Sequence, residues 1–127
     1  MDIIISNAST KPLYDQIAAQ IKDAILSGEL REGDPLPSIR TLANDLRVSI
    51  ITTKRAYQDL EAQGFINSFQ GKGSFVAQGN RTLLREDRMR RVEELLDRAL
   101  TEAAPLGLTL PELHEMLDLL ASEKDAN

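Results

Sequence analysis

The stretch PSIRTLANDLRVSIITTKRAYQDLEAQG, residues 37–64, decides the fold. It predicts a short helix capped by Ser38, a tight break at Arg47-Val48, and a second helix that is capped by Ser49 and ends at Gly64. The inner faces are expected to consist of Ile39, Leu42, Ala43 and Leu46 in the first helix and Thr53, Ala56, Tyr57 and Leu60 in the second. Two short helices joined in this way are typical of a helix-turn-helix.

The residues on either side complete a winged helix-turn-helix over residues 1–78. Upstream, apolar residues recur at helical spacing after Pro12 and predict a helix of about fifteen residues that ends at Gly28. Downstream, residues 65–69 and 74–77 predict two strands joined by a glycine-containing turn over residues 70–73. The fold class is therefore mostly α, with a small β-hairpin wing.

Residues 79–127, the tail, are predicted to form two amphipathic helices. Pro105-Leu106-Gly107 separates the helices, and Thr109-Leu110-Pro111-Glu112 resembles a capping box at the start of the second. So few residues cannot enclose a core, and we expect the tail to bury its apolar face in a homodimer. The alternative is that it covers its own winged helix. The residues expected in the dimer interface are Leu84, Val92, Leu95, Leu96, Leu100, Leu113, Leu117 and Leu120.

Composition excludes several classes of site. The 127 residues include no cysteine, so a disulfide, a thiolate metal site and a cysteine nucleophile are excluded. His114, the single histidine, has no metal-ligand partners at suitable spacing. We expect no metal, no cofactor and no catalysis. No signal peptide or membrane span is evident, which favours the cytoplasm.

The net charge of -5 is unusual for a protein that binds DNA. The tail accounts for most of it, because residues 78–127 carry seven Lys or Arg against eleven Asp or Glu. Residues 36–76 carry five basic residues against three acidic ones. The acidity therefore lies mostly away from the expected contact surface, and modest, salt-sensitive DNA binding is predicted.

Several strings in order resemble the DNA-binding domain of the GntR family of bacterial regulators, from about residue 10 to residue 77. They are PLYDQI at 12–17, GEL at 28–30, GDPLPSIRTLA at 33–43, RAYQDLE at 55–61 and GKGSFV at 71–76. The short tail resembles that of the YtrA subfamily, in which the tail serves dimerisation. This resemblance implies a repressor that binds a palindromic operator as a homodimer, and it suggests control of a transporter operon.

The resemblance also implies which residues contact DNA, and their chemistry independently suits the role. Arg40 suits a phosphate or a base edge, hydroxyls at the start of the third helix suit phosphates, and Lys72 at the wing tip suits the minor groove or its phosphates. Each of these residues also has a purely structural alternative. Arg40 could form a surface ion pair, Ser49 could serve only as a helix cap, and Arg55 could be a solvated surface charge. The complete predicted set is Ser38, Arg40, Ser49, Ile51, Thr52, Lys54, Arg55, Gly71 and Lys72.

Ile50-Ile51 departs from the family, many of whose members have an arginine at the second position of this helix. Since the inner positions of the helix are already assigned, at least one of the two isoleucines must be exposed. Ile50 could tuck back against its neighbours, and Ile51 could rest on thymine methyl groups in the major groove.

Two alternatives remain open at this point. A winged helix can serve protein–protein contact instead of specific DNA binding, and the acidic net charge with Ile50-Ile51 motivates that alternative. A small-molecule effector could bind between subunits, although the residues left after the DNA-binding domain are too few for an enclosed cavity of usual size.

Overall fold

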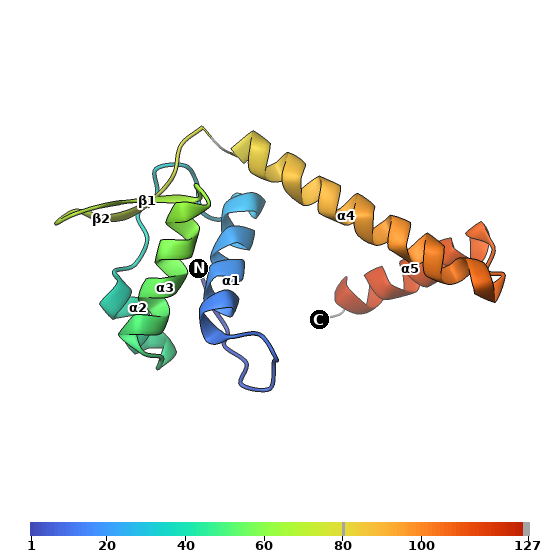
Figure 1. Ribbon diagram of the computed structural model, residues 1–127, viewed down its shortest axis with the longest axis horizontal. Coiled ribbons are helices and arrows are strands. Elements are labelled where there is room, and N and C mark those ends of the chain that lie inside the picture. The colour runs from blue at the N-terminus through green and yellow to red at the C-terminus, as the bar shows by residue number, and fades with distance from the viewer. Residues whose placement is uncertain (80, 126–127) are drawn as a thin grey trace. The chain divides into compact units, whose positions relative to one another are not determined.

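The computed structural model describes residues 1–79 and 81–125, without the Leu83 side chain. It has helices α1–α5, strands β1 and β2, and a short 3-10 helix η1 (Figure 1). The bounds are α1 Leu13–Ser27, α2 Ile39–Leu46, α3 Ile50–Ala62, β1 Ile66–Phe69, β2 Gly73–Val76, α4 Arg81–Ala103, η1 Ala104–Leu106 and α5 Leu110–Asp125. None of the helices in this described part is long and apolar enough to cross a membrane.

The chain divides into two compact units. The winged-helix unit comprises Met1–Glu86, and the tail unit begins at Asp87, inside α4. The division therefore falls a few residues beyond the boundary expected at 78/79. The architecture agrees with the predicted class, because five helices accompany a single two-stranded hairpin in the described residues.

Hydroxyl caps begin α2 and α3, as predicted. The Ser38 Oγ accepts a hydrogen bond from the backbone N–H of Thr41 at 3.1 Å, and the Ser49 Oγ accepts one from Thr52 at 3.0 Å. Each bond satisfies a backbone donor that the first turn of a helix leaves unpaired. Arg47 ends α2 in the left-handed conformation, with φ of 57°. The reversal at this residue turns the chain from α2 into α3.

The core lies where α1, α2 and α3 meet the base of the hairpin. Ile17, Ile21, Leu60 and Ile66 are fully buried, and the expected inner face of α3 is buried throughout. Tyr57 belongs to this face, and its hydroxyl donates to the Pro37 carbonyl at 2.7 Å. Burial raises the pKa of Tyr57 to about 12. This hydrogen bond joins α3 to the loop that leads into α2.

Strands β1 and β2 form the predicted wing. They pair antiparallel from Ile66↔Val76 to Phe69↔Gly73, within one residue of the expected bounds. The base of the hairpin is tied to the loop before α2, because Leu36 N–H donates to the Ser74 carbonyl and Val76 N–H to the Asp34 carbonyl, both at 2.9 Å. Gly71 in the turn has φ of 78°, a conformation that favours glycine. The wing is thus an anchored projection.

The chain before α1 is held by glutamine side chains that sequence patterns did not single out. Gln20 makes a two-way amide pair with the backbone of Ile4, accepting from its N–H at 2.9 Å and donating to its carbonyl at 2.7 Å. The buried Gln16 similarly accepts from Ser6 N–H at 2.8 Å and donates to the Ser6 carbonyl at 2.9 Å. These bonds attach the N-terminal segment to α1.

In the tail unit, α4 ends at Ala103 and is followed by η1, which confirms the break expected at residues 105–107. The capping box that begins α5 is also present. Glu112 Oε1 accepts from the Thr109 backbone N–H at 3.1 Å, and the Thr109 Oγ1 accepts from the Glu112 N–H at 3.3 Å. The Thr109 hydroxyl also donates to Glu112 Oε1, at 2.9 Å, and the two hydrogen bonds that the carboxylate accepts from Thr109, first from its backbone N–H and then from its hydroxyl, lower the pKa of Glu112.

Candidate nucleic-acid interface

The outer face of α3 carries Ile51, Lys54, Arg55 and Gln58. Residues three and four apart lie on one side of an α-helix, and all four of these side chains are exposed. Thr53 and Leu60, on the opposite side, are fully buried in the core. The outer face is therefore a fixed row of side chains on a helix whose other side is anchored.

Ile51 is 81 % exposed and Ile50 is 47 % exposed. The expectation that at least one of them lies on the surface is confirmed. About half of the Ile50 surface is buried, whereas Ile51 is the most exposed large apolar side chain in the described residues.

The hydroxyl groups of Ser49 and Thr52, at the start of α3, are hydrogen-bonded to each other. The Ser49 Oγ donates to the Thr52 Oγ1 at 2.8 Å while it accepts from the Thr52 N–H. The Thr52 oxygen acts as an acceptor there, so its own proton can be donated to a phosphate oxygen. The capping role of Ser49 is confirmed, and it leaves a donor at the surface. Ser38 and Thr41 repeat the arrangement at the start of α2, at 2.8 Å.

Arg40 lies in the first turn of α2 and is exposed. It forms no ion pair with a carboxylate in the part of the chain that the structure describes. The alternative of a surface arginine paired to a neighbouring carboxylate therefore has no support in that part. Its guanidinium group can offer two parallel donors to a phosphate or a guanine.

Arg55 is exposed but not simply solvated. Its guanidinium carbon lies 3.8 Å from the centre of the Tyr14 ring, at the start of α1. Arginine over an aromatic face is attracted by the charge distribution of the ring. The structure thus places Arg55 across the junction of α3 and α1, where an exposed guanidinium edge can still donate to a phosphate.

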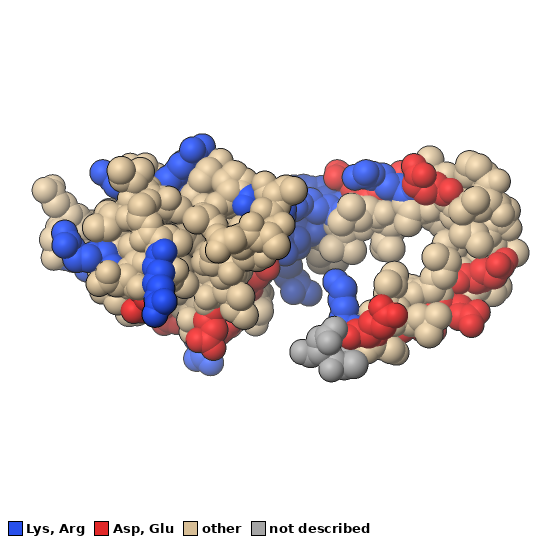
Figure 2. Space-filling model, turned by 90° about the horizontal axis from the view of Figure 1, so that it is seen from below, with Lys and Arg blue, Asp and Glu red and all other residues tan. Residues whose placement is uncertain are grey.

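At the wing tip, Lys72 and Gly71 are exposed, and the Lys72 N–H closes the turn on the Phe69 carbonyl at 2.9 Å. On the face seen in Figure 2, Lys and Arg side chains of the winged-helix unit emerge at several separate places. The positive charge of the site is thus dispersed over α2, α3 and the wing.

Most residues of the predicted dimer set lie exposed along α4 and α5 in the tail unit. Between 50 % and 60 % of the surface of Val92, Leu95, Leu96, Leu100, Leu117 and Leu120 is accessible. Ala103 is the one buried residue among those described in this unit, and Leu113 is partly buried. The tail unit therefore leaves a large apolar face without cover of its own.

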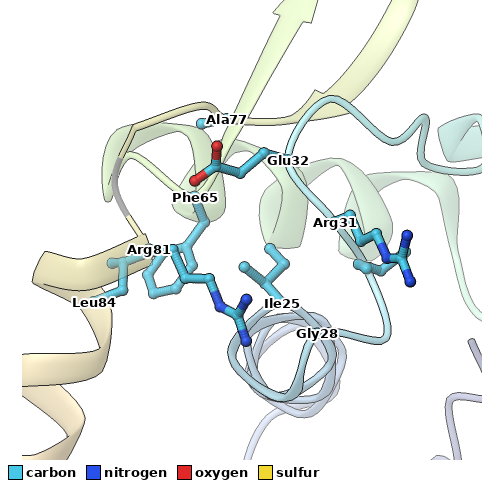
Figure 3. A pocket seen from close by; sticks show the side chains of 9 residues that line it. Ile25, Gly28, Arg31, Glu32, Phe65, Ala77, Arg81 and Leu84 are labelled. Atoms are coloured by element: carbon cyan, nitrogen blue, oxygen red, sulfur yellow. The ribbon is translucent and has the colours of Figure 1, made fainter.

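Leu84 differs from the rest of the predicted dimer set, because it belongs to the winged-helix unit. It lines a cavity of about 390 Å³ at the end of α1, where Arg81 Nη2 donates to the Leu26 carbonyl at 3.4 Å (Figure 3). The cavity is lined by Ile25, Gly28, Leu30, Arg31, Glu32, Phe65, Ala77, Arg81 and Leu84. None of these residues belongs to the predicted DNA-contact set.

Comparison with known proteins identifies relatives of this arrangement. Residues 13–76 match the family described as bacterial regulatory proteins, gntR family. The chain is 33 % identical to the HTH-type transcriptional repressor YtrA of Bacillus subtilis (strain 168) over 121 residues, which cover 95 % of this chain and 93 % of that protein.

Solved structures add two further comparisons. YtrA from Sulfolobus acidocaldarius, a GntR-family transcription factor, is 41 % identical with a TM-score of 0.57, covering 72 % of this chain and 97 % of that one. The DNA-binding domain of AraR in complex with operator ORX1 is 29 % identical with a TM-score of 0.55, covering 61 % of this chain and 96 % of that one.

Proposed function

The chain belongs to the gntR family of bacterial regulatory proteins, and from this premise we propose that it is a repressor that binds a palindromic operator as a homodimer. It is a DNA-binding transcriptional regulator and not an enzyme. The proposal concerns how it binds, how it pairs and what it controls. The observation that carries it is the combination of an exposed outer face on α3 with an uncovered apolar face on the tail unit.

We propose that α3 enters the major groove with the wing beside it. Arg40, the Thr52 hydroxyl and Lys72 contact phosphates or the minor groove, while Ile51 and Lys54 face base edges. The exposure of Arg40, Ile51, Lys54 and Lys72, the partial exposure of Thr52, and the absence of an ion pair at Arg40 in the described residues support this assignment. Ser38, Ser49 and Gly71 contribute by holding the two helix starts and the wing turn in position.

The tail, residues 79–127, is proposed to supply the dimer interface. Burying the exposed half of a leucine side chain contributes about 1 kcal/mol, and twofold symmetry repeats every such contact. The half-exposed leucines of α4 and α5 support this role. Their exposed surface contributes nothing to stability while it faces water, and it would contribute if a second subunit covered it. A dimer of this kind would present two α3 helices to half-sites about one helical turn apart.

A footprint on the intergenic DNA next to the gene tests the operator proposal. A protected palindrome with half-sites about one turn apart is the expected result. Binding should also weaken steeply as salt rises, because phosphate contacts release counterions. Salt-independent capture of another protein with no footprint would favour the protein–protein alternative.

The regulated genes are proposed to include a transporter operon. The protein is proposed to act in the cytoplasm, the compartment that contains the DNA. The likeness to a repressor along nearly the whole chain supports repression. Transcript levels in a deletion strain test both points. Transporter transcripts should rise without the protein, whereas a fall would make it an activator.

A further inference from the structure

The most exposed large apolar side chain among the described residues lies on α3. Ile51 is 81 % exposed, whereas the isoleucines at positions 17, 21, 25 and 66 of the same unit are buried; Ile50, its neighbour in the first turn of α3, is 47 % exposed, and Ile4, in the segment before α1, is 76 % exposed. An exposed isoleucine forgoes the stabilisation that burial would provide. Packing in the free protein therefore gives no role to this side chain, which is available to a partner on the outer face of α3.

We propose that Ile51 contacts the 5-methyl group of a pyrimidine in the major groove, so that the protein discriminates thymine from uracil at one step of each half-site. This inference rests on the proposed DNA-binding function and deepens it. It assigns the base-reading role to a side chain that has no hydrogen-bonding group.

The position of Ile51 supports this ligand. Lys54 follows one turn later and Gln58 two turns later on the same exposed row. A lysine on that row can donate to a base edge in the same groove, and its positive charge attracts the helix to DNA. Ile51 thus begins an exposed row suited to the major groove, on the side of α3 directly opposite the fully buried Thr53 and Leu60.

The chemistry of base edges narrows the choice of base. In the major groove, guanine, adenine and cytosine present hydrogen-bond donors or acceptors, whereas thymine adds a methyl group. An isoleucine placed against N7 or O6 of a purine leaves a polar group desolvated and unpaired, which is unfavourable. The neighbouring Ser49 and Thr52 hydroxyls are held in the helix cap by their mutual 2.8 Å hydrogen bond. They are therefore not free to move and pair with a purine atom that Ile51 would leave unpaired.

The test begins with selection of a bound operator from a random DNA duplex library by the full-length protein. The operator is then synthesised with uracil in place of each thymine in turn, which removes a methyl group and leaves base pairing intact. We expect one position in each half-site at which the substitution weakens binding about fourfold, the value for one buried methyl or methylene group. A G·C pair at that step should bind more tightly when the cytosine carries a 5-methyl group.

Variants assign the effect to Ile51. Ile51→Ala should bind the thymine and uracil operators equally, and Ile51→Val should retain much of the difference. Ile4→Ala is the matched control, because Ile4 is 76 % exposed and lies in the segment before α1. It should keep the wild-type ratio of the two affinities.

Failure of the inference is distinguishable from failure of the proposed function. If the wild-type protein selects an operator but binds every uracil version as tightly as the thymine version, the role of Ile51 is refuted and DNA binding stands. The same holds if Ile51→Ala keeps the wild-type ratio. If no sequence is enriched from the library, sequence-specific DNA binding itself is refuted, and the role of Ile51 with it.

Discussion

The guanidinium carbon of Arg55 in α3 lies 3.8 Å from the centre of the Tyr14 ring in α1. The contact joins α3, the helix proposed to enter the major groove, to the first helix of the domain. The contact gives the Arg55 side chain, for which a solvated charge is the alternative to DNA contact, a preferred position on the Tyr14 ring.

We predict that this contact stabilises the fold by about 0.5–1 kcal/mol, the range for an exposed cation–π pair. A double-mutant cycle with Tyr14→Leu and Arg55→Gln, measured by urea unfolding, should show that coupling energy. Tyr14→Phe keeps the ring and should keep most of it. Additive effects of the two substitutions would mean that the pair contributes no stability.

Burial of Tyr57 predicts a loss of stability at alkaline pH. Its pKa is about 12 in the folded protein against an ordinary value of 10.0. Between these values the unfolded chain releases a proton that the folded chain retains, so the stabilisation is complete below pH 10 and lost as pH rises to about 12. The predicted loss is about 1–3 kcal/mol in the free energy of unfolding.

The control for this prediction is Tyr57→Phe. It removes the hydrogen bond to the Pro37 carbonyl and should cost about 1 kcal/mol at neutral pH. Its stability should then decline less than that of the wild type between pH 10 and pH 12, because residue 57 no longer titrates. Parallel pH profiles for the two proteins would contradict the assignment.

The apolar face of the tail predicts that a charge placed on it will separate the dimer. Leu95→Asp and Leu117→Asp should each shift the full-length chain from dimer to monomer in sedimentation, because a buried unpaired carboxylate is strongly unfavourable. Leu106→Asp is the matched control. Leu106 is 75 % exposed and lies in η1, outside the predicted interface, so this variant should stay dimeric. Dimers of all three variants would place the interface elsewhere.

Dispersed positive charge predicts additive effects on the salt dependence of DNA binding. Arg40→Ala and Lys72→Ala should each reduce the slope of log affinity against log salt concentration by about 1 for each subunit that loses a phosphate contact. Arg31→Ala removes an exposed arginine that lines the cavity at the end of α1, and it should leave the slope unchanged. Equal slopes for the wild type and Lys72→Ala would remove the wing tip from the contact set.

Local patterns were sufficient to predict most of the secondary structure. Ser38 and Ser49 cap their helices as their types and positions indicated, and Gly71 supplies the turn conformation that the wing needs. Such features depend on interactions between residues that are three or four positions apart. Interactions at so short a separation can be recognised in the sequence itself. The burial of Tyr57 and the exposure of at least one of Ile50 and Ile51 followed in the same way from helical periodicity.

Only the tertiary structure decided which distant residues meet. The stacking of Arg55 on Tyr14 spans two helices, and the attachment of Ile4 by Gln20 joins segments 16 residues apart. Leu84 shares an apolar period with the leucines of the tail, yet it lines a cavity in the winged-helix unit. Periodicity identifies the apolar side chains that are expected to be buried, whereas the packing of separate elements determines which residues bury them.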